Sequence, residues 1–286
     1  ANAGIAASKA AAAAYTGSAS MLAEAVHSGA DCANQLLLLL GIRQAKRAPT
    51  PDHPLGFGKA TYFWSFMVAL LLFSMGGAFS IYEGVHKLSS PEPVESPWIA
   101  IAVLGIGVVL EAWSLRGCIL EIREKAGDMP LWRYFRDSRE SELIVVMGED
   151  IAALAGLALA LLAVVLSMVT GNPMWDAIGS IAVGVLLVIV AIGVGIEVRA
   201  LLIGQSAEPA ERTAMEEWLK TRPEIAELYN MISFQMGTYL FVAVKARMAE
   251  RDSAKVLIDQ VNAVQDALKV EFPDVRWVFF EPDDKG

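Results

Sequence analysis

The chain has 286 residues, of which 55% are hydrophobic, and it carries a net charge of −9 with a mean hydropathy of +0.46. Ordinary soluble domains are less apolar than this, so the composition indicates an integral membrane protein. The two cysteines, Cys32 and Cys118, lack the spacing of a zinc finger or of a disulfide framework. Acidic residues concentrate toward the C-terminus, which excludes nucleic acid as a partner of that part.

The apolar segments predict six transmembrane helices, because one span needs about 20 predominantly apolar residues. The first, up to residue 15, is too short for a span and is expected to be the end of a helix that starts before Ala1. Proline and glycine residues at 43–59 and 89–93 predict loops. The other five helices are expected at 19–42, 60–88, 98–120, 143–169 and 174–202, with a charged connection at 121–142.

The distribution of basic residues predicts how these helices cross the membrane. The 43–59 loop holds four Lys or Arg residues and the 121–142 connection holds five, whereas 89–97 and 170–174 hold none. Loops that are rich in Lys and Arg stay on the cytoplasmic side. Both termini are therefore expected in the cytoplasm, and we expect the membrane to be a bacterial cell (inner) membrane.

After Gly204 the composition becomes that of a soluble domain. The pattern predicts helices at 209–220 and 253–270 and strands at 231–236, 239–248 and 275–280. This αββαβ order predicts a small ferredoxin-like α+β domain. We therefore divide the chain into a six-helix transmembrane domain, 1–204, and a cytoplasmic domain, 205–286. So small a domain is marginally stable alone, so pairing in a homodimer is expected.

The 19–42 helix carries a polar stripe on an otherwise apolar surface. At 100° per residue the stripe lies in one sector of the helix, and it consists of Glu24, His27, Asp31, Asn34 and Gln35. Each ionised group at the centre of a bilayer costs roughly 2.5–3.5 kcal/mol, so the stripe needs partners, water or a bound ion. An imidazole and a carboxylate one turn apart, as in His27 and Asp31, can bind one divalent cation from a single rigid surface.

Other roles are open for several of these residues. His27 and Asp31 could form a buried polar pair that only fixes helix packing, and Glu24 could lie at the outer interface. Asn34 and Gln35 are better placed to support a ligand than to bind zinc, because amides are weak zinc ligands. Asp176 opens the last apolar helix, where a negative charge stabilises the helix N-terminus.

Together these motifs resemble the cation diffusion facilitator family. The resemblance rests on Thr16-Gly17-Ser18, on the 21–31 segment MLAEAVHSGAD, on Asn34-Gln35 and on the 53–59 segment HPLGFGK. Six spans followed by an αββαβ tail match the same family along the whole chain. The resemblance implies a homodimeric exporter that exchanges cytoplasmic Zn²⁺, or a related divalent cation, for protons by alternating access. It also implies four metal ligands, one pair from helix two and one from helix five.

The fifth apolar helix departs from the family pattern. It has no His/Asp pair, and its candidate ligands are Glu149 and Asp150, which point 100° apart and cannot both face one metal squarely. We favour Asp150, which is closer to the expected level of the site. The expected ligands are His27, Asp31, Asp150 and Glu149, with Glu24, Asn34 and Gln35 as supporting residues.

The ligand types indicate zinc as the transported ion. An imidazole suits Zn²⁺ better than Mg²⁺ or Ca²⁺, whereas Mn²⁺, Fe²⁺, Co²⁺, Ni²⁺ and Cd²⁺ stay as alternatives. Arriving protons compete with metal for the same groups, which explains antiport in the simplest way. The rival hypothesis is a membrane-anchored metal sensor or assembly protein that does not transport. An enzyme is not expected, since no HExxH or comparable hydrolytic motif occurs.

Overall fold

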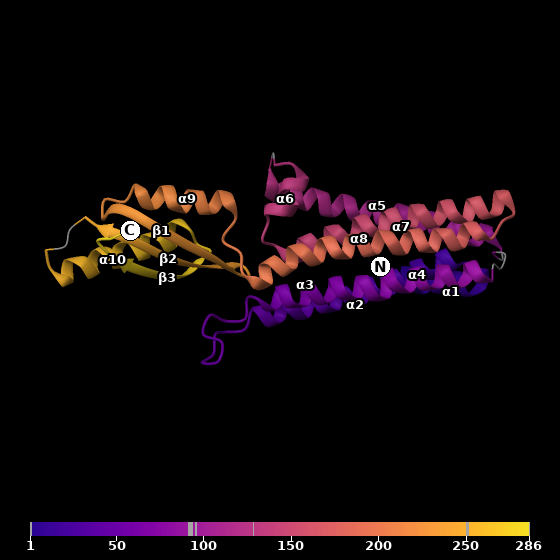
Figure 1. Cartoon of the computed structure of the whole chain (residues 1–286), viewed down its shortest axis with the longest axis horizontal. Helices are drawn as coiled ribbons and strands as arrows, with labels where there is room; N and C mark the ends of the chain where they lie inside the picture. The colour runs from indigo at the N-terminus through magenta and orange to yellow at the C-terminus, as the bar shows by residue number, and fades with distance from the viewer. Residues whose placement is uncertain (1, 91–93, 95, 128, 250–251, 286) are drawn as a thin grey trace.

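The computed structural model describes residues 2–90, 94, 96–127, 129–249 and 252–285. Long helices form a bundle, and a smaller region with a β-sheet lies beyond one end of the bundle (Figure 1). Part of the predicted break after the third apolar segment, residues 91–93, lies outside the described residues. The chain is therefore a helical membrane protein with a small C-terminal sheet region.

Within the described residues, four helical segments are long and apolar enough to cross a membrane. They are Ala60–Ser89, which comprises α3, η1 and α4, then α5 (Pro97–Ala126), α7 (Ser141–Thr170) and α8 (Met174–Ile203). The first two helices, α1 (Asn2–Thr16) and α2 (Ala19–Ala45), belong to the same bundle. The described part of α1 has 15 residues, and the polar stripe makes α2 less apolar than the other four.

The segment Ala60–Ser89 is one continuous helix with a π-helical stretch in the middle. Its parts are α3 (Ala60–Leu71), η1 (Leu72–Ala78) and α4 (Phe79–Ser89). The sequence predicts the length of this helix but not the π-helical turn, which lies where the chain packs closely on α8. A Cβ atom at Gly77 would lie 2.6 Å from Val188 Cγ2. Small residues let two backbones approach this closely in a membrane.

The charged connection between the fourth and fifth apolar segments is more helical than the sequence predicts. Helix α5 continues to Ala126, and a short helix, α6 (Leu131–Asp137), follows. An apolar cluster that comprises Cys118, Ile122, Tyr134 and Met147 holds α6 against α5 and α7. The sequence predicts a charged connection here and no element within it, and these tertiary contacts stabilise helix in a segment that is rich in charge.

The sheet region consists of α9 (Pro209–Lys220), β1 (Ile225–Met236), β2 (Tyr239–Met248), α10 (Ala254–Glu271) and β3 (Val275–Pro282). The strand order is β1-β2-β3, with β1 antiparallel and β3 parallel to β2. The inward residues of β2, such as Leu240 and Val242, form one core with Leu219 of α9 and Leu268 of α10. Both helices therefore cover the same face of the sheet. Strand β1 begins earlier than predicted because register irregularities in its first half interrupt the alternation.

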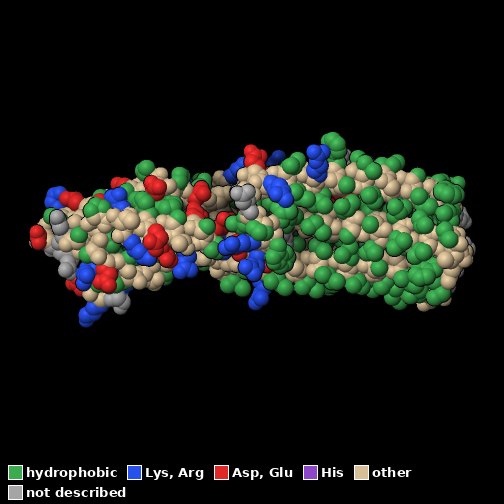
Figure 2. Space-filling model, turned by 90° about the horizontal axis from the view of Figure 1, so that it is seen from above, with side chains coloured by type: hydrophobic (Ala, Val, Ile, Leu, Met, Phe, Trp, Pro, Cys, Tyr) green, Lys and Arg blue, Asp and Glu red, His purple; other side chains and the backbone are tan. Residues whose placement is uncertain are grey.

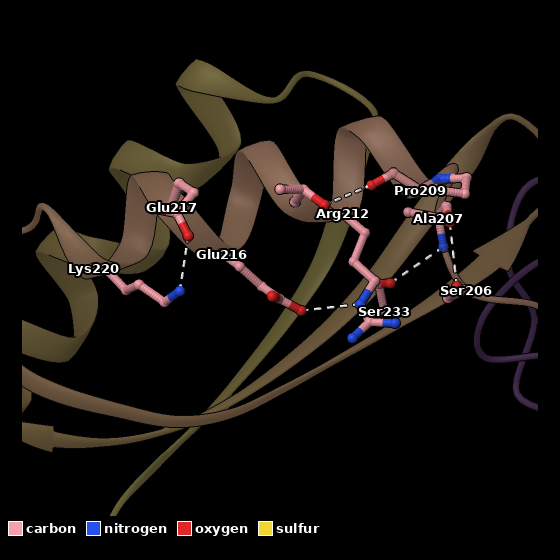
Figure 3. A network of polar contacts seen from close by, with 9 residues as sticks. Ser206, Ala207, Pro209, Arg212, Glu216, Glu217, Lys220 and Ser233 are labelled. Carbon is pink, nitrogen blue, oxygen red and sulfur yellow. Dashed lines mark hydrogen bonds and ion pairs between the residues drawn. The ribbon is translucent and has the colours of Figure 1, made fainter.

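A short linker after α8 fixes α9 on the sheet (Figure 3). The amide of Ala207 donates to Ser233 Oγ of β1 at 3.2 Å, and Arg212 pairs with Glu216 within α9 at 2.9 Å. Gly204 adopts φ +130°, and a Cβ atom there would lie 2.2 Å from the Phe234 ring. The linker can turn here because glycine tolerates this backbone angle and leaves room for the ring.

The surface of the chain changes character between its two ends (Figure 2). Hydrophobic side chains cover the visible face of the helical bundle, whereas Lys and Arg gather at the end of the bundle next to the sheet region. The sheet region itself carries both signs of charge. An apolar surface with basic side chains at one end is what a membrane-spanning bundle presents to lipid and to the headgroups on one side.

Candidate metal site

The N-terminal end of α2 is held by a buried carboxylate from α8. Asp176 accepts hydrogen bonds from Ser18 Oγ at 2.6 Å, from Ser20 Oγ at 2.5 Å and from the Ala19 amide at 2.6 Å. Asp176 lies in the first turn of its own helix, as the sequence predicts, but its partners belong to the start of α2. Helix α2 is thereby anchored one to two turns before its polar stripe.

The polar stripe of α2 faces the interior of the bundle along most of its length. Glu24, His27 and Asn34 are fully buried, and the side chain of Asp31 is 14% exposed. Gln35 is exposed and lies outside this cluster. His27 and Asp31 lie one helical turn apart in the sequence, and their Nδ1 and Oδ1 atoms are 3.7 Å apart. The pair that the sequence singles out is therefore present as a close imidazole and carboxylate.

The π-helical segment η1 lies beside His27. A Cβ atom at Gly76 would lie 3.8 Å from His27 Nδ1. Glycine at this position leaves space next to the imidazole, and π-helical turns are frequent at functional sites. The irregular turn therefore lies at the level of the polar stripe.

Helix α7 contributes two carboxylates, which point in different directions. Glu149 accepts a hydrogen bond from Asn34 Nδ2 of α2 at 2.5 Å, whereas Asp150 lies 3.4 Å from Ser114 Oγ of α5. Glu149 is 8% exposed. The 100° between consecutive helical residues separates them as expected. These contacts lead us to prefer Glu149 as the residue of α7 that faces α2, where the sequence alone favoured Asp150.

Sequence reasoning missed Lys9, which completes the cluster from α1. Lys9 is fully buried, and its Nζ donates to Ser28 Oγ at 2.8 Å and lies 3.3 Å from Glu24 Oε2. A lone lysine in an alanine-rich helix was a detectable signal, because a charged group in an apolar segment needs a partner. No local pattern connects it to Glu24, which lies on a different helix.

Five buried polar atoms of α2 have no hydrogen-bond partner among the described residues. They are Glu24 Oε1, His27 Nδ1, His27 Nε2, Asp31 Oδ1 and Asn34 Oδ1. Buried polar atoms are normally satisfied, so a group of exceptions on one helix face calls for an explanation. The oxygen atoms carry lone pairs, and so does whichever imidazole nitrogen is not protonated. A lone pair is what an atom needs to bind a metal ion or a proton.

The described part of the chain contains no three His, Cys, Asp or Glu side chains close enough together to hold a metal ion in this conformation. His27 and Asp31 are a pair, and Glu149 joins them only through Asn34. A complete ligand shell therefore needs a rearrangement of side chains or a movement between α2 and α7.

Two cavities lie near this cluster and at the end of the bundle. One, of about 520 Å³, is lined by α1 and α5 and includes Glu111 and Ser114. The other, of about 1040 Å³, lies between the bundle and the sheet region and includes Arg139 and Glu211. Burial raises the pKa of Glu211, and repulsion from nearby carboxylates raises it further. The second cavity is thus lined by charges of both signs.

The fold and the cluster define a class of protein: a helical membrane protein with a buried polar face of imidazole and carboxylates. The transmembrane domain of cation efflux proteins matches residues 1–203. The chain therefore belongs to the cation efflux, or cation diffusion facilitator, family, which is a family of transporters.

Several known proteins are similar to this chain. "Proton-coupled zinc antiporter SLC30A9, mitochondrial" from Xenopus laevis is 38% identical over 78% of this chain and 40% of its own length. "Metal tolerance protein C4" from Arabidopsis thaliana is 35% identical over 76% of this chain and 48% of its own length. "Cation-efflux pump FieF" from Cronobacter sakazakii is 25% identical over 91% of this chain and 81% of its own length. The chain spans about half the length or less of the first two relatives.

Proposed function

We propose that this protein exports a divalent metal ion, preferentially Zn²⁺, in exchange for protons by alternating access. The observation that carries the proposal is the row of unsatisfied, fully buried atoms on α2 beside Glu149. Two relatives are named a proton-coupled zinc antiporter and a cation-efflux pump, which supports the same function. These five atoms form no hydrogen bond among the described residues, so they are available to a cation that enters the site.

We infer that His27, Asp31 and Glu149 are ligands, with Asp150 as the alternative on α7. A zinc ion held by His27 and Asp31 alone would keep about one net positive charge in a low-dielectric site, which is costly. Glu149 neutralises that charge if it exchanges Asn34 for the metal. Asn34 and Glu24 are then supporting residues, and Gln35 contributes least because it is exposed.

Proton coupling follows from the chemistry of these ligands. Metal binding requires a neutral His27 and ionised carboxylates, so protons that arrive from the other side displace the metal. Mn²⁺, Fe²⁺, Co²⁺, Ni²⁺ and Cd²⁺ bind similar groups, and the imidazole disfavours Mg²⁺ and Ca²⁺. The ions are cargo, and the reaction requires no catalytic cofactor.

We propose a six-span architecture in which α1 and α2 also cross the membrane. The support is that α2 has 27 residues and packs against the Ala60–Ser89 segment, α7 and α8. Residues 1–204 would form the transmembrane domain and 205–286 a ferredoxin-like domain. The basic residues between α2 and α3 and after α5 support placing both termini in the cytoplasm or its equivalent. The mitochondrial names of some relatives give no support to a bacterial inner membrane, and localisation experiments would identify the membrane.

The decisive experiment measures metal-dependent proton flux in sealed vesicles that contain the purified protein. We expect zinc to drive proton movement, and His27→Ala or Asp31→Ala to lower the flux at least about tenfold because a ligand is lost. Both variants should elute from a size-exclusion column as the wild type does. Wild-type flux in either variant would contradict the assignment. Zinc binding without any flux would instead support the rival hypothesis, a sensor or assembly protein.

A further inference from the structure

We propose that the ammonium group of Lys9 is a permanent positive charge in the transport site. It neutralises Glu24 while the site holds no metal. It also weakens metal binding, so that the metal can leave. This inference rests on the proposed metal site. It is carried by the contacts of one ammonium group that reaches from α1 into the polar face of α2.

The position of Lys9 is unusual for a lysine. The side chain is fully buried, and its Nζ lies 2.8 Å from Ser28 Oγ and 3.3 Å from Glu24 Oε2. Near the end of a span a lysine can extend its ammonium toward water, but Lys9 is buried among helices instead. Ionisable residues inside a membrane protein are costly and commonly serve function.

The ammonium of Lys9 interacts with residues of the site beyond its direct partners, Glu24 and Ser28. It acts electrostatically on Glu24, Asp31 and Glu111. Glu24 has one oxygen paired with Lys9, and its other oxygen, Oε1, is buried without a partner. A carboxylate that is half satisfied by a lysine is available to a second cation only on its free side.

A divalent ion beside His27 would therefore meet a positive charge already in place. Like charges repel strongly where the effective dielectric constant is low, so the ammonium lowers the affinity of the site for metal. An exporter benefits from this effect, because an ion that binds too tightly leaves slowly. Ser28, one residue after His27, holds the ammonium in register with the site.

The rival interpretation is an ion pair that only joins α1 to α2. Buried pairs contribute little net stability, but the loss of one partner leaves an uncompensated charge. The two interpretations predict different results when the charge of Lys9 is removed: tighter zinc binding if the ammonium repels the metal, and unchanged or weaker binding if the pair only joins the helices.

The test is zinc binding by calorimetry to the full chain in detergent, followed by zinc-driven flux in vesicles. We expect Lys9→Met and Lys9→Gln to bind zinc at least about tenfold more tightly and to transport it more slowly, since the repulsion is gone. Lys9→Gln keeps a hydrogen-bond donor for Ser28 and Glu24. Lys9→Arg, which keeps the charge, should match the wild type. Adding Glu24→Gln to Lys9→Met should return the affinity to the wild-type range, because one positive and one negative charge are then both removed and the net charge beside the site is the same as in the wild type.

The outcomes separate this inference from the proposed function. Unchanged or weaker zinc binding in both neutral variants, or failure of both to fold, would overturn the role of Lys9 and leave a structural ion pair. Tighter binding in Lys9→Arg would also overturn it, because the effect would then not be one of charge. If the wild type binds no zinc, or if His27→Ala binds zinc as the wild type does, the proposed metal site fails and the role of Lys9 fails with it.

Discussion

At the scale of single residues, the arrangement of Glu149 and Asp150 determines how the site can be completed. Glu149 contacts α2 through Asn34, and Asp150 contacts α5 through Ser114. Only the former has a hydrogen bond to the helix that carries His27 and Asp31, among the contacts of these two carboxylates. Two adjacent carboxylates on one helix therefore serve different neighbours, as their 100° separation requires.

We predict that Glu149→Gln lowers zinc affinity by at least about tenfold, because the charge that faces α2 is lost. Asp150→Asn should lower it less. Both replacements keep the size of the side chain, so each controls for the other. Calorimetric titration with zinc and the pH dependence of vesicle flux would measure the difference. A larger effect from Asp150→Asn would return the ligand role to Asp150 and imply that α7 rotates in the metal-bound state.

Asp176 is a second residue whose role depends on a distant partner. It is 2% exposed and receives its hydrogen bonds from the first residues of α2. We predict that Asp176→Ala lowers stability by about 1.5–3 kcal/mol, since hydrogen bonds to a charged group are lost in a buried site. Thermal unfolding in detergent would show a lower midpoint. Asp176→Asn should be less damaging because it still accepts hydrogen bonds, and an unchanged midpoint for Asp176→Ala would contradict the anchoring role.

At the scale of helices, the contact between the α3–η1–α4 segment and α8 depends on small residues. A Cβ atom at Gly184 would lie 2.8 Å from the carbonyl oxygen of Gly77 and 2.7 Å from Ile81 Cγ1. A backbone atom cannot move aside as a side chain can. Gly77 belongs to η1, the π-helical turn that borders His27, so this close approach lies next to the site.

We predict that Gly184→Ala destabilises the bundle by about 1–3 kcal/mol, because overpacking separates α4 from α8. Gly193→Ala, on the same helix, is the matched control, since a Cβ atom there would meet nothing within 4 Å. Alanine has the higher helix propensity, so the control should be neutral or slightly stabilising. Equal thermal midpoints for the two variants would show that the close approach is unimportant.

At the scale of the whole molecule, the outer face of the sheet, opposite α9 and α10, carries an aromatic patch around Phe241 and Phe279, beside the ion pair of Lys245 and Glu281. Helices α9 and α10 cover the other face. Phe241 and Phe279 stack on the outer face with ring centroids 5.3 Å apart, and Phe279 is 60% exposed. Aromatic side chains are enriched in protein interfaces. The homodimer expected from the sequence therefore has a suitable surface, which we propose as its contact.

We predict that Phe279→Asp converts a dimer of the full chain in detergent into a monomer, because a charge replaces an aromatic contact. Val270→Asp is the control, since Val270 is 81% exposed but lies on α10, away from this face. Light scattering coupled to size-exclusion chromatography measures the mass. A wild-type monomer, or a dimer that survives Phe279→Asp, would exclude this surface as the interface.

The amino-acid sequence was sufficient to predict the features that depend on local periodicity. Apolar length placed four of the spans to within a few residues, and alternation placed most of the sheet region. The 100° repeat put His27 and Asp31 on one helix face, and the structure places them 3.7 Å apart. These results follow because each helix fixes the angular relations of its own residues, whatever surrounds it.

Relations between helices required the tertiary structure. Periodicity does not determine how far α7 is rotated about its axis, so it could not decide whether Glu149 or Asp150 faces α2. It could not pair Lys9 with Glu24 or Asp176 with the start of α2, because these contacts join segments on separate helices. Rotation and pairing are set by how side chains of neighbouring helices pack, and that packing depends on every helix of the bundle at once.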